Sequence, residues 1–211
     1  MTALSAGSDG RAPVAATPNA SPYLYFSDDR PIYLAGTTGP SWRIRRGVVR
    51  LSHPSPDGNT PVFAGIARAG DILGSEIQLF GTYTCDAYPI GEVELEAWLQ
   101  ADTRSLLRTI AAAERRTVEA ISLRAGEAMD RIRRLFVILS GETAQETIPV
   151  FIPCLKDMAD ITGLTQETVS RVVSQLRRLG ILTRQGRSHG VIVMNALKKL
   201  PLQASQCLKH S

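Results

Sequence analysis

The sequence predicts an α+β protein in which an N-terminal β-roll or jelly-roll barrel is joined by one long helix to a C-terminal winged helix-turn-helix. Three observations support this prediction. Short apolar segments broken by turn residues extend to about residue 100, a helical periodicity without proline follows, and the last third reads helix, turn, helix and two short strands. The composition, 44% hydrophobic and 21% charged, is that of a folded globular protein.

The barrel is predicted to span residues 23–100 and to follow a flexible tail. Residues 1–22 are small, polar and rich in proline, and they lack the basic start and apolar core of a secretory signal. Beyond them, apolar stretches such as "WRIRRGVVRLSHP" and "PVFAGIARAGDILG" alternate with turn signals that include Gly39 and Gly70. Segments of this length between tight turns are typical of antiparallel strands in a sandwich or barrel.

Residues 101–124 are predicted to form a dimerisation helix. Its N-cap is Asp102 or Thr103, and Gly126 is expected to separate it from the next helix. Apolar side chains recur three or four positions apart along one face: Leu107, Ile110, Val118, Ile121 and Ala125. Such a seam is suited to packing against a copy of itself, which would give a two-fold homodimer. The alternative is that the helix packs only on its own barrel.

Residues 125–211 are predicted to form the winged helix-turn-helix domain. Gly163 ends a short first helix, "CLKDMADIT", whose expected buried residues are Leu155, Met158, Ala159 and Ile161. Thr165 caps the second helix, "QETVSRVVSQLRRLG", whose expected inward residues are Val169, Val172, Val173 and Leu176. The segments "ILTRQ" and "GVIVM" then form a two-stranded wing.

The outward face of the second helix is polar and suited to contact with DNA. Helical spacing places five side chains away from the core: Gln166, Glu167, Ser170, Arg171 and Ser174. An arginine can bond both O6 and N7 of guanine, a glutamate can accept from the cytosine amino group, and a glutamine or serine can contact adenine or a phosphate. Basic residues also outnumber acidic ones in the last third of the chain. The alternative is a solvated helix face with an i,i+4 ion pair.

The segment "MADITGLTQETVSRVVSQLRRLGIL" resembles the helix-turn-helix of the CRP/FNR family of bacterial transcription regulators, and the resemblance extends over nearly the whole chain. It implies that Glu167 and Arg171 contact bases. Ser170 stands where FNR-like members carry serine, which implies an FNR-type half-site that resembles TTGAT and is repeated as a palindrome. Flanking or phosphate contacts would come from Thr165, Gln166 and Arg187. The resemblance also implies a sensor role for the barrel and activation through RNA polymerase, while repression by occlusion of the site is equally compatible.

The candidate effector pocket differs from that of cyclic-nucleotide-binding relatives, which hold the phosphate with a Glu and an Arg-Ser or Arg-Thr pair. Here Ser75 stands near the expected Glu, and Tyr83 precedes Thr84 where the Arg is expected, so cAMP is disfavoured. An iron–sulfur cluster is disfavoured because it needs four cysteines and the chain has 3. Haem, through Cys85 or His53, stays open. The pocket would be formed by Gly74, Ser75, Glu76, Tyr83, Thr84 and Cys85.

Other classes of protein fit the sequence less well. The 3 histidines are too few for the metal site of a cupin enzyme, and no catalytic triad order, P-loop or dinucleotide fingerprint occurs, so an enzyme is not expected. No apolar run approaches the roughly 20 residues that span a bilayer, and the widely spaced cysteines fit a cytoplasmic protein. The remaining rival is a winged-helix module that binds an acidic protein, with a barrel that binds a small ligand.

Overall fold

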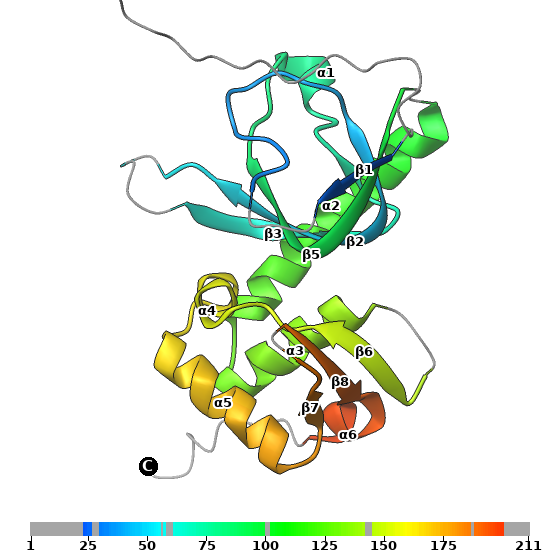
Figure 1. The fold of residues 1–211 in the computed structure, drawn as a ribbon. Helices are drawn as coiled ribbons and strands as arrows, with labels where there is room; N and C mark the ends of the chain where they lie inside the picture. The colour runs from blue at the N-terminus through cyan, green and yellow to red at the C-terminus, as the bar shows by residue number, and fades with distance from the viewer. Residues whose placement is uncertain are drawn as a thin grey trace, which may run out of the picture.

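The computed structural model describes residues 23–26, 30–55, 57, 61–99, 102–141, 145–186 and 188–200. The segment expected to be a flexible tail lies outside this part of the chain. The described residues form two lobes, an N-terminal one built around a sheet and a C-terminal one made mainly of helices. The long helix α2 (Thr103–Arg124) runs from the first lobe to the second (Figure 1).

The N-terminal lobe is one antiparallel sheet with the strand order β1-β5-β2-β3, in which β4 also pairs with β2. Its elements are β1 (Tyr23–Phe26), β2 (Trp42–His53), β3 (Val62–Arg68), β4 (Ile72–Leu73), α1 (Ile77–Phe80) and β5 (Asp86–Ala97). The register between β2 and β5 shifts on both sides of Arg46, and the second shift spans Gly47. At Gly47 φ is +94°, and a side chain would collide with the carbonyl of Glu92. The described strands do not close into a barrel, and they correspond to the β-roll of the predicted fold class.

The interior of the roll is filled by aromatic and aliphatic side chains. The rings of Tyr33 and Tyr83 stack with centroids 3.8 Å apart and planes 12° from parallel. The Tyr83 hydroxyl donates a hydrogen bond of 2.6 Å to the carbonyl of Pro40. The buried residues around this stack are Ile44, Val49, Leu51, Ala67, Leu73, Cys85, Ala87, Val93 and Leu95.

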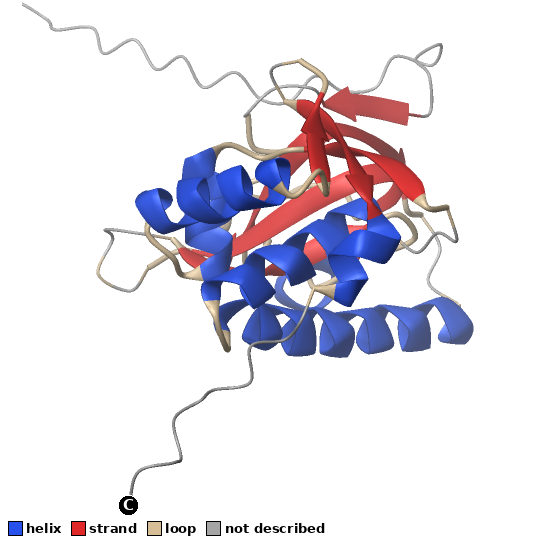
Figure 2. Cartoon of the chain, turned by 90° about the horizontal axis from the view of Figure 1, so that it is seen from below, coloured by secondary structure: helices blue, strands red, loops and turns tan. Residues whose placement is uncertain are grey.

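Helix α2 packs across β3 with one face and leaves the opposite face uncovered. Asp102, one of the two predicted N-caps, accepts a hydrogen bond of 2.6 Å from the backbone N–H of Ser105. The opposite face carries apolar side chains that are 62–65% exposed: Leu107, Ile110, Val118 and Ile121. Figure 2 shows α2 lying along the edge of the molecule.

The C-terminal lobe begins after Gly126, which separates α2 from α3 as predicted. Its elements are α3 (Ala128–Ser140), β6 (Thr147–Phe151), α4 (Leu155–Thr162), α5 (Gln166–Arg178), β7 (Leu182–Arg184), β8 (His189–Val193) and α6 (Met194–Lys199). The predicted wing hairpin is present, since β7 pairs with β8 in antiparallel fashion. Strand β6 was not predicted, and it pairs with the other side of β8 to make a three-stranded sheet in the order β6-β8-β7. The short helices α1 and α6 were also not predicted.

The two lobes share hydrophobic contacts. The large buried cluster includes Leu135 of α3 and Leu176 of α5, and it extends to Phe63, Ile66 and Ile90 of the N-terminal sheet. The position of the C-terminal helices therefore depends on packing against that sheet. No helix among the described residues is both long and apolar enough to cross a membrane.

Candidate DNA-binding site

The turn between α4 and α5 sets the direction of α5. Gly163 adopts φ +64°, a left-handed conformation that ends α4 at little cost for glycine. Thr165 is the N-cap of α5, as predicted, and its hydroxyl accepts a hydrogen bond of 3.2 Å from the backbone N–H of Thr168. The two threonine hydroxyls also lie 2.9 Å apart. This cap fixes the residue at which α5 begins, and hence which side chains its first turns present.

The inward face of the two helices agrees with the sequence pattern except at one residue. The predicted inward residues of α5 are all buried: Val169, Val172, Val173 and Leu176. In α4, Met158, Ala159 and Ile161 are buried as predicted. The prediction for Leu155 is wrong, since its side chain is 39% exposed. Leu155 is the first residue of α4, and burial on this helix begins one turn later, at Met158.

The outward face of α5 consists of the five exposed residues that the helical spacing brings together: Gln166, Glu167, Ser170, Arg171 and Ser174. Arg171 Nη2 lies 3.1 Å from Glu167 Oε1, and the two side chains are 69% and 86% exposed. An ion pair this exposed contributes only a few tenths of a kcal/mol, so either side chain can exchange it for another partner. Arg187, predicted to contact phosphate, lies outside the described residues.

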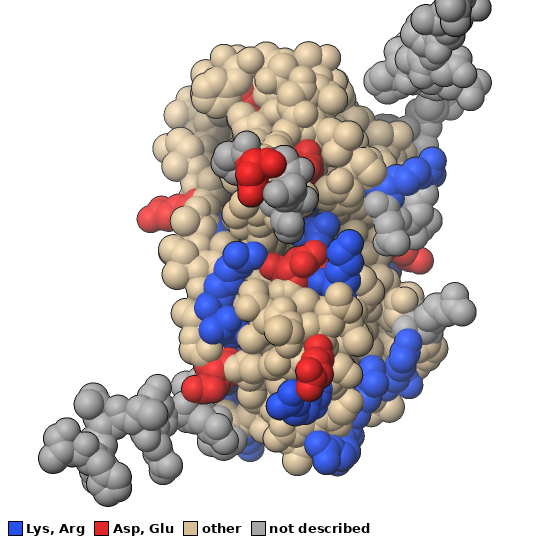
Figure 3. All heavy atoms as spheres, turned by 90° about the vertical axis from the view of Figure 1, so that its left-hand side faces the viewer, with Lys and Arg blue, Asp and Glu red and all other residues tan. Residues whose placement is uncertain are grey.

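The face of the molecule that carries α4 and α5 has a basic lower part (Figure 3). Arg177 and Arg178 lie in the last turn of α5 and are exposed. Exposed cationic side chains also stand on the neighbouring elements: Lys156, Arg184, Lys198 and Lys199. Such a distribution attracts the phosphates of a nucleic acid without reading its sequence.

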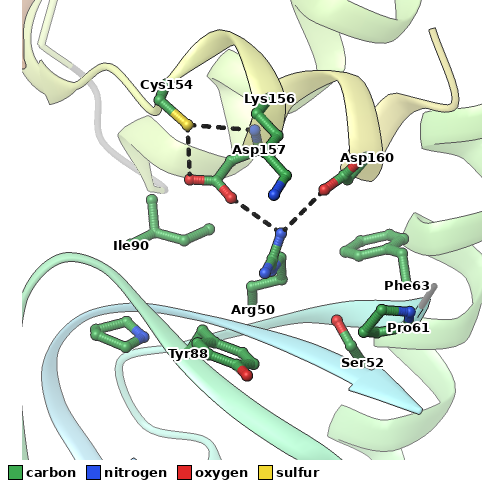
Figure 4. Close-up of a pocket in the computed structure, with 11 residues that line it drawn as sticks. Arg50, Ser52, Pro61, Phe63, Tyr88, Ile90, Cys154, Lys156, Asp157 and Asp160 are labelled. Atoms are coloured by element: carbon green, nitrogen blue, oxygen red, sulfur yellow. Dashed lines mark hydrogen bonds and ion pairs between the residues drawn. The ribbon is translucent and has the colours of Figure 1, made fainter. Parts of the chain in front are cut away.

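Two acidic side chains of α4 are held by an arginine of the N-terminal sheet. The Arg50 side chain rises from β2 toward α4, where its Nη1 lies 3.0 Å from Asp157 Oδ1 and 3.7 Å from Asp160 Oδ2 (Figure 4). The guanidinium also lies over the ring of Tyr88, 5.2 Å from its centroid. These groups line a cavity of about 560 Å³ between the sheet and α4. Arg50 therefore pairs with both carboxylates of α4 on the side of this helix that faces the N-terminal sheet.

The end of α4 is held by an arginine from each of the two preceding helices. Arg124 Nη2 donates a hydrogen bond of 2.7 Å to the carbonyl of Asp160, and Arg131 Nη1 donates one of 3.1 Å to the carbonyl of Thr162. Cations at this position complement the negative end of a helix dipole and bond carbonyls that the helix leaves free. Sequence reasoning missed Arg50, Arg124 and Arg131, because their partners lie far along the chain.

The residues predicted to line an effector pocket lie near one another, but the ring of Tyr83 fills the space between them. Tyr83 is buried, and a Cβ on Gly74 would come within 2.5 Å of its ring. Glu76 Oε1 lies 3.4 Å from the backbone nitrogen of Thr84 and 3.4 Å from its hydroxyl. Ser75, beside them, is half-buried. The predicted pocket therefore lies around a packed tyrosine.

Cys85, the candidate haem ligand, is a core residue of the roll. Its side chain is buried in the same cluster as Tyr33 and Tyr83, and this burial raises the pKa of the thiol to about 11. The other candidate, His53, is exposed and its Nδ1 lies 3.1 Å from the carbonyl of Thr84. Within the described residues no group of three or more His, Cys, Asp or Glu side chains could hold a metal ion.

Comparison with known proteins links this geometry to a family. Residues 130–200 match the Crp-like helix-turn-helix domain. The regulator LdrP of Thermus thermophilus is 26% identical over 184 residues, which cover 82% of this chain and 94% of LdrP. The nitrogen fixation regulation protein FixK of Bradyrhizobium diazoefficiens is 27% identical over 161 residues, 67% of this chain, and the chain spans 65% of the length of FixK.

Solved structures show the same fold. A CRP-family transcriptional regulator from Thermus thermophilus superimposes with a TM-score of 0.65 at 24% identity, covering 83% of this chain and 94% of that one. FixK2 from Bradyrhizobium japonicum gives a TM-score of 0.65 at 23% identity, covering 87% and 98%. The predicted fold class is confirmed, and the chain is a regulator rather than an enzyme. With α5 exposed as the second helix of the matched helix-turn-helix domain, this chain is a DNA-binding transcription regulator of the CRP/FNR type.

Proposed function

We propose that the protein binds, as a homodimer, a palindromic DNA site whose half-site resembles TTGAT. The observation that carries this proposal is the exposed row on α5, where Glu167 and Arg171 lie one turn apart in the N-terminal half of the helix. In helix-turn-helix proteins this part of the second helix enters the major groove.

The chemistry of the row supports reading of bases. Arg171 would bond O6 and N7 of a guanine, and Glu167 would accept from the amino group of a cytosine. Ser170 and Ser174 lie beside them and would contact adjacent base edges or phosphates. Thr165, Gln166 and Arg187 would position the helix on the phosphate backbone, which carries no sequence information of its own.

The uncovered face of α2 supports the dimer. Four large apolar side chains in a row, each 62–65% exposed, are unfavourable in water, and burial of each against a second copy would contribute about 1.5–3 kcal/mol. The fifth residue of the predicted seam, Ala125, is exposed at the end of α2. Binding to successive major grooves would require the two α5 helices of such a dimer to lie about 34 Å apart.

The proposal includes no requirement for cAMP. Tyr83 fills the space beside Gly74, and the stretch that would hold a cyclic phosphate lacks the arginine that pairs with it. We further propose that the protein acts in the cytoplasm and activates transcription through contact with RNA polymerase, the mode that the family resemblance implies.

Selection of bound sequences from a random DNA pool, with protein purified without added ligand, tests the proposal. A palindrome built from TTGAT and its inverted partner is expected. Salt-sensitive binding with no enriched motif would contradict sequence-specific binding without an effector. Absence of any salt-dependent affinity for duplex DNA would favour the rival function, a winged-helix module that binds an acidic protein.

A further inference from the structure

A second cavity lies outside the roll, between the sheet and the first half of α2. Its volume is about 560 Å³, within the range of about 300–1,000 Å³ typical of small-molecule sites. The start of β2, the turn at residues 70–72 and α2 all contribute to its wall. It is separate from the interior of the roll, where the two stacked tyrosines lie.

Three arginines from two elements line this cavity: Arg43, Arg45 and Arg108. Arg43 is half-buried and Arg108 is exposed, and neither guanidinium forms a direct ion pair in the described part of the chain. Asp102 interacts with Arg108 only through longer-range electrostatics. Arg45 Nη1 lies 3.6 Å from Glu96 Oε2 in a half-exposed pair. Two positive charges near the cavity are therefore available to a ligand, and a third is only weakly engaged.

The one acidic side chain among the described wall residues, Asp71, is already paired with arginines. Both carboxylate oxygens of Asp71 accept hydrogen bonds from Arg115 Nη2, at 2.8 and 2.7 Å, and Arg116 Nη1 lies 3.5 Å away. The backbone N–H of Arg68 donates to the same carboxylate at 3.0 Å. Asp71 thus has its own partners on α2 and β3, and its charge does not offset that of the three arginines.

The remaining wall indicates what kind of anion would fit. Ile72 and Ala112 provide an apolar surface, while Ser105 and Thr109 place hydroxyl oxygens on the same side of α2. The described wall residues include no aromatic ring on which a base could stack. A guanidinium binds phosphate and carboxylate groups through two parallel hydrogen bonds. We propose that this cavity is a binding site for a small, non-aromatic organic polyanion that carries phosphate or carboxylate groups and bridges Arg43 of the sheet and Arg108 of α2.

Isothermal titration calorimetry of the full chain at low, fixed ionic strength tests this site. The two probes are pyrophosphate and citrate, and their separate titrations distinguish phosphate from carboxylate chemistry. Saturable binding of at least one probe is expected, with one site per chain. Arg43→Gln and Arg108→Gln are each expected to weaken it about tenfold, the usual effect of losing one charge-assisted hydrogen bond.

The matched control is Arg104→Gln, which removes the same charge from α2 one turn before Arg108 and outside the cavity wall. It is expected to change the affinity by less than about threefold, because an exposed charge at that distance is screened. Failure of both probes to bind the wild type would overturn the proposal. Unchanged affinity in both the Arg43→Gln and Arg108→Gln variants would also overturn it, since the anion would then occupy another basic surface.

Discussion

Arg171 and Glu167 illustrate how a single pair can serve two states. In the free protein they bond to one another across one turn of α5, and no other residue in the described part of the chain bonds to either side chain. Bound to DNA, each would exchange this contact for a base edge. Because the ion pair is weak, replacing it by a contact to DNA costs little free energy. In the free protein the pair also restricts the directions in which the two side chains extend, so less conformational entropy is lost on binding.

We expect Arg171→Ala to weaken binding to the preferred site by about 1–3 kcal/mol and to relax selection at one base pair, because a bidentate contact to guanine is lost. Binding to a panel of single-base variants of the site measures both effects. Arg187→Ala is the comparison, since loss of a phosphate contact weakens binding to all sequences alike. Identical profiles for the two variants would contradict a base-reading role for Arg171.

Cys85 is expected to be about 100-fold less reactive toward iodoacetamide at pH 8 than an ordinary thiol. Burial raises its pKa from 9.0 to about 11, so the reactive thiolate is correspondingly rarer. Because the folded protein holds this proton more tightly than the unfolded chain, the stability contributed by Cys85 is complete below pH 9 and is lost as the pH rises toward 11. Alkylation of Cys85 mapped by mass spectrometry at several pH values checks the prediction, with the same cysteine in urea-unfolded protein as the ordinary thiol.

At the scale of elements, local patterns predicted the long amphipathic segments and missed the short ones. Helix α5 was predictable because its cap and its inward residues all lie within the helix or next to it. Strand β6 was missed because Pro149 reads as a boundary, yet β6 is an edge strand, where a missing N–H is tolerated. The signal for β6 was the alternation of the buried residues Ile148 and Val150 with the exposed residues Thr147 and Pro149. This alternation is too short to distinguish a strand from a loop.

We expect Ile121→Glu to convert a dimer into a monomer. The side chain is 65% exposed in the single chain, so the substitution leaves the monomer fold intact but would place a charge in the proposed seam. Sedimentation velocity measures the change. Ala113→Glu, exposed on the flank of the same helix, should leave the dimer in place. A dimeric Ile121→Glu protein would refute pairing along this face of α2.

At the scale of the whole molecule, the helix-turn-helix is attached to the N-terminal sheet by contacts that no local pattern reveals. Arg50 and Asp157 form an ion pair across 107 positions of sequence. Arg124 similarly reaches the carbonyls of α4 from the end of α2. The outward face of α5 could be predicted from the sequence. The contacts that orient the neighbouring helix α4 come from residues far away in the sequence, so no local pattern predicts them. Such contacts are visible only once the chain is folded.

Arg50→Ala is expected to loosen α4 while lowering global stability by no more than about 1 kcal/mol, because both carboxylates stay partly hydrated. Hydrogen exchange monitored by mass spectrometry should show faster exchange at residues 155–162 and unchanged exchange in α2. Arg45→Ala removes a pair within the sheet and serves as the control. Unchanged protection of α4 in the Arg50 variant would show that apolar packing alone holds the helix.

The stacked tyrosines of the roll also give the molecule an optical signal of its own. Two phenol rings held 3.8 Å apart couple their electronic transitions, and Trp42 packs against the same cluster, where it can receive their excitation energy. Near-ultraviolet circular dichroism responds to such fixed aromatic packing. A compound that displaced either ring would change the dichroism and the tyrosine-to-tryptophan energy transfer together. Screening for ligands of the interior can therefore proceed on the unlabelled protein.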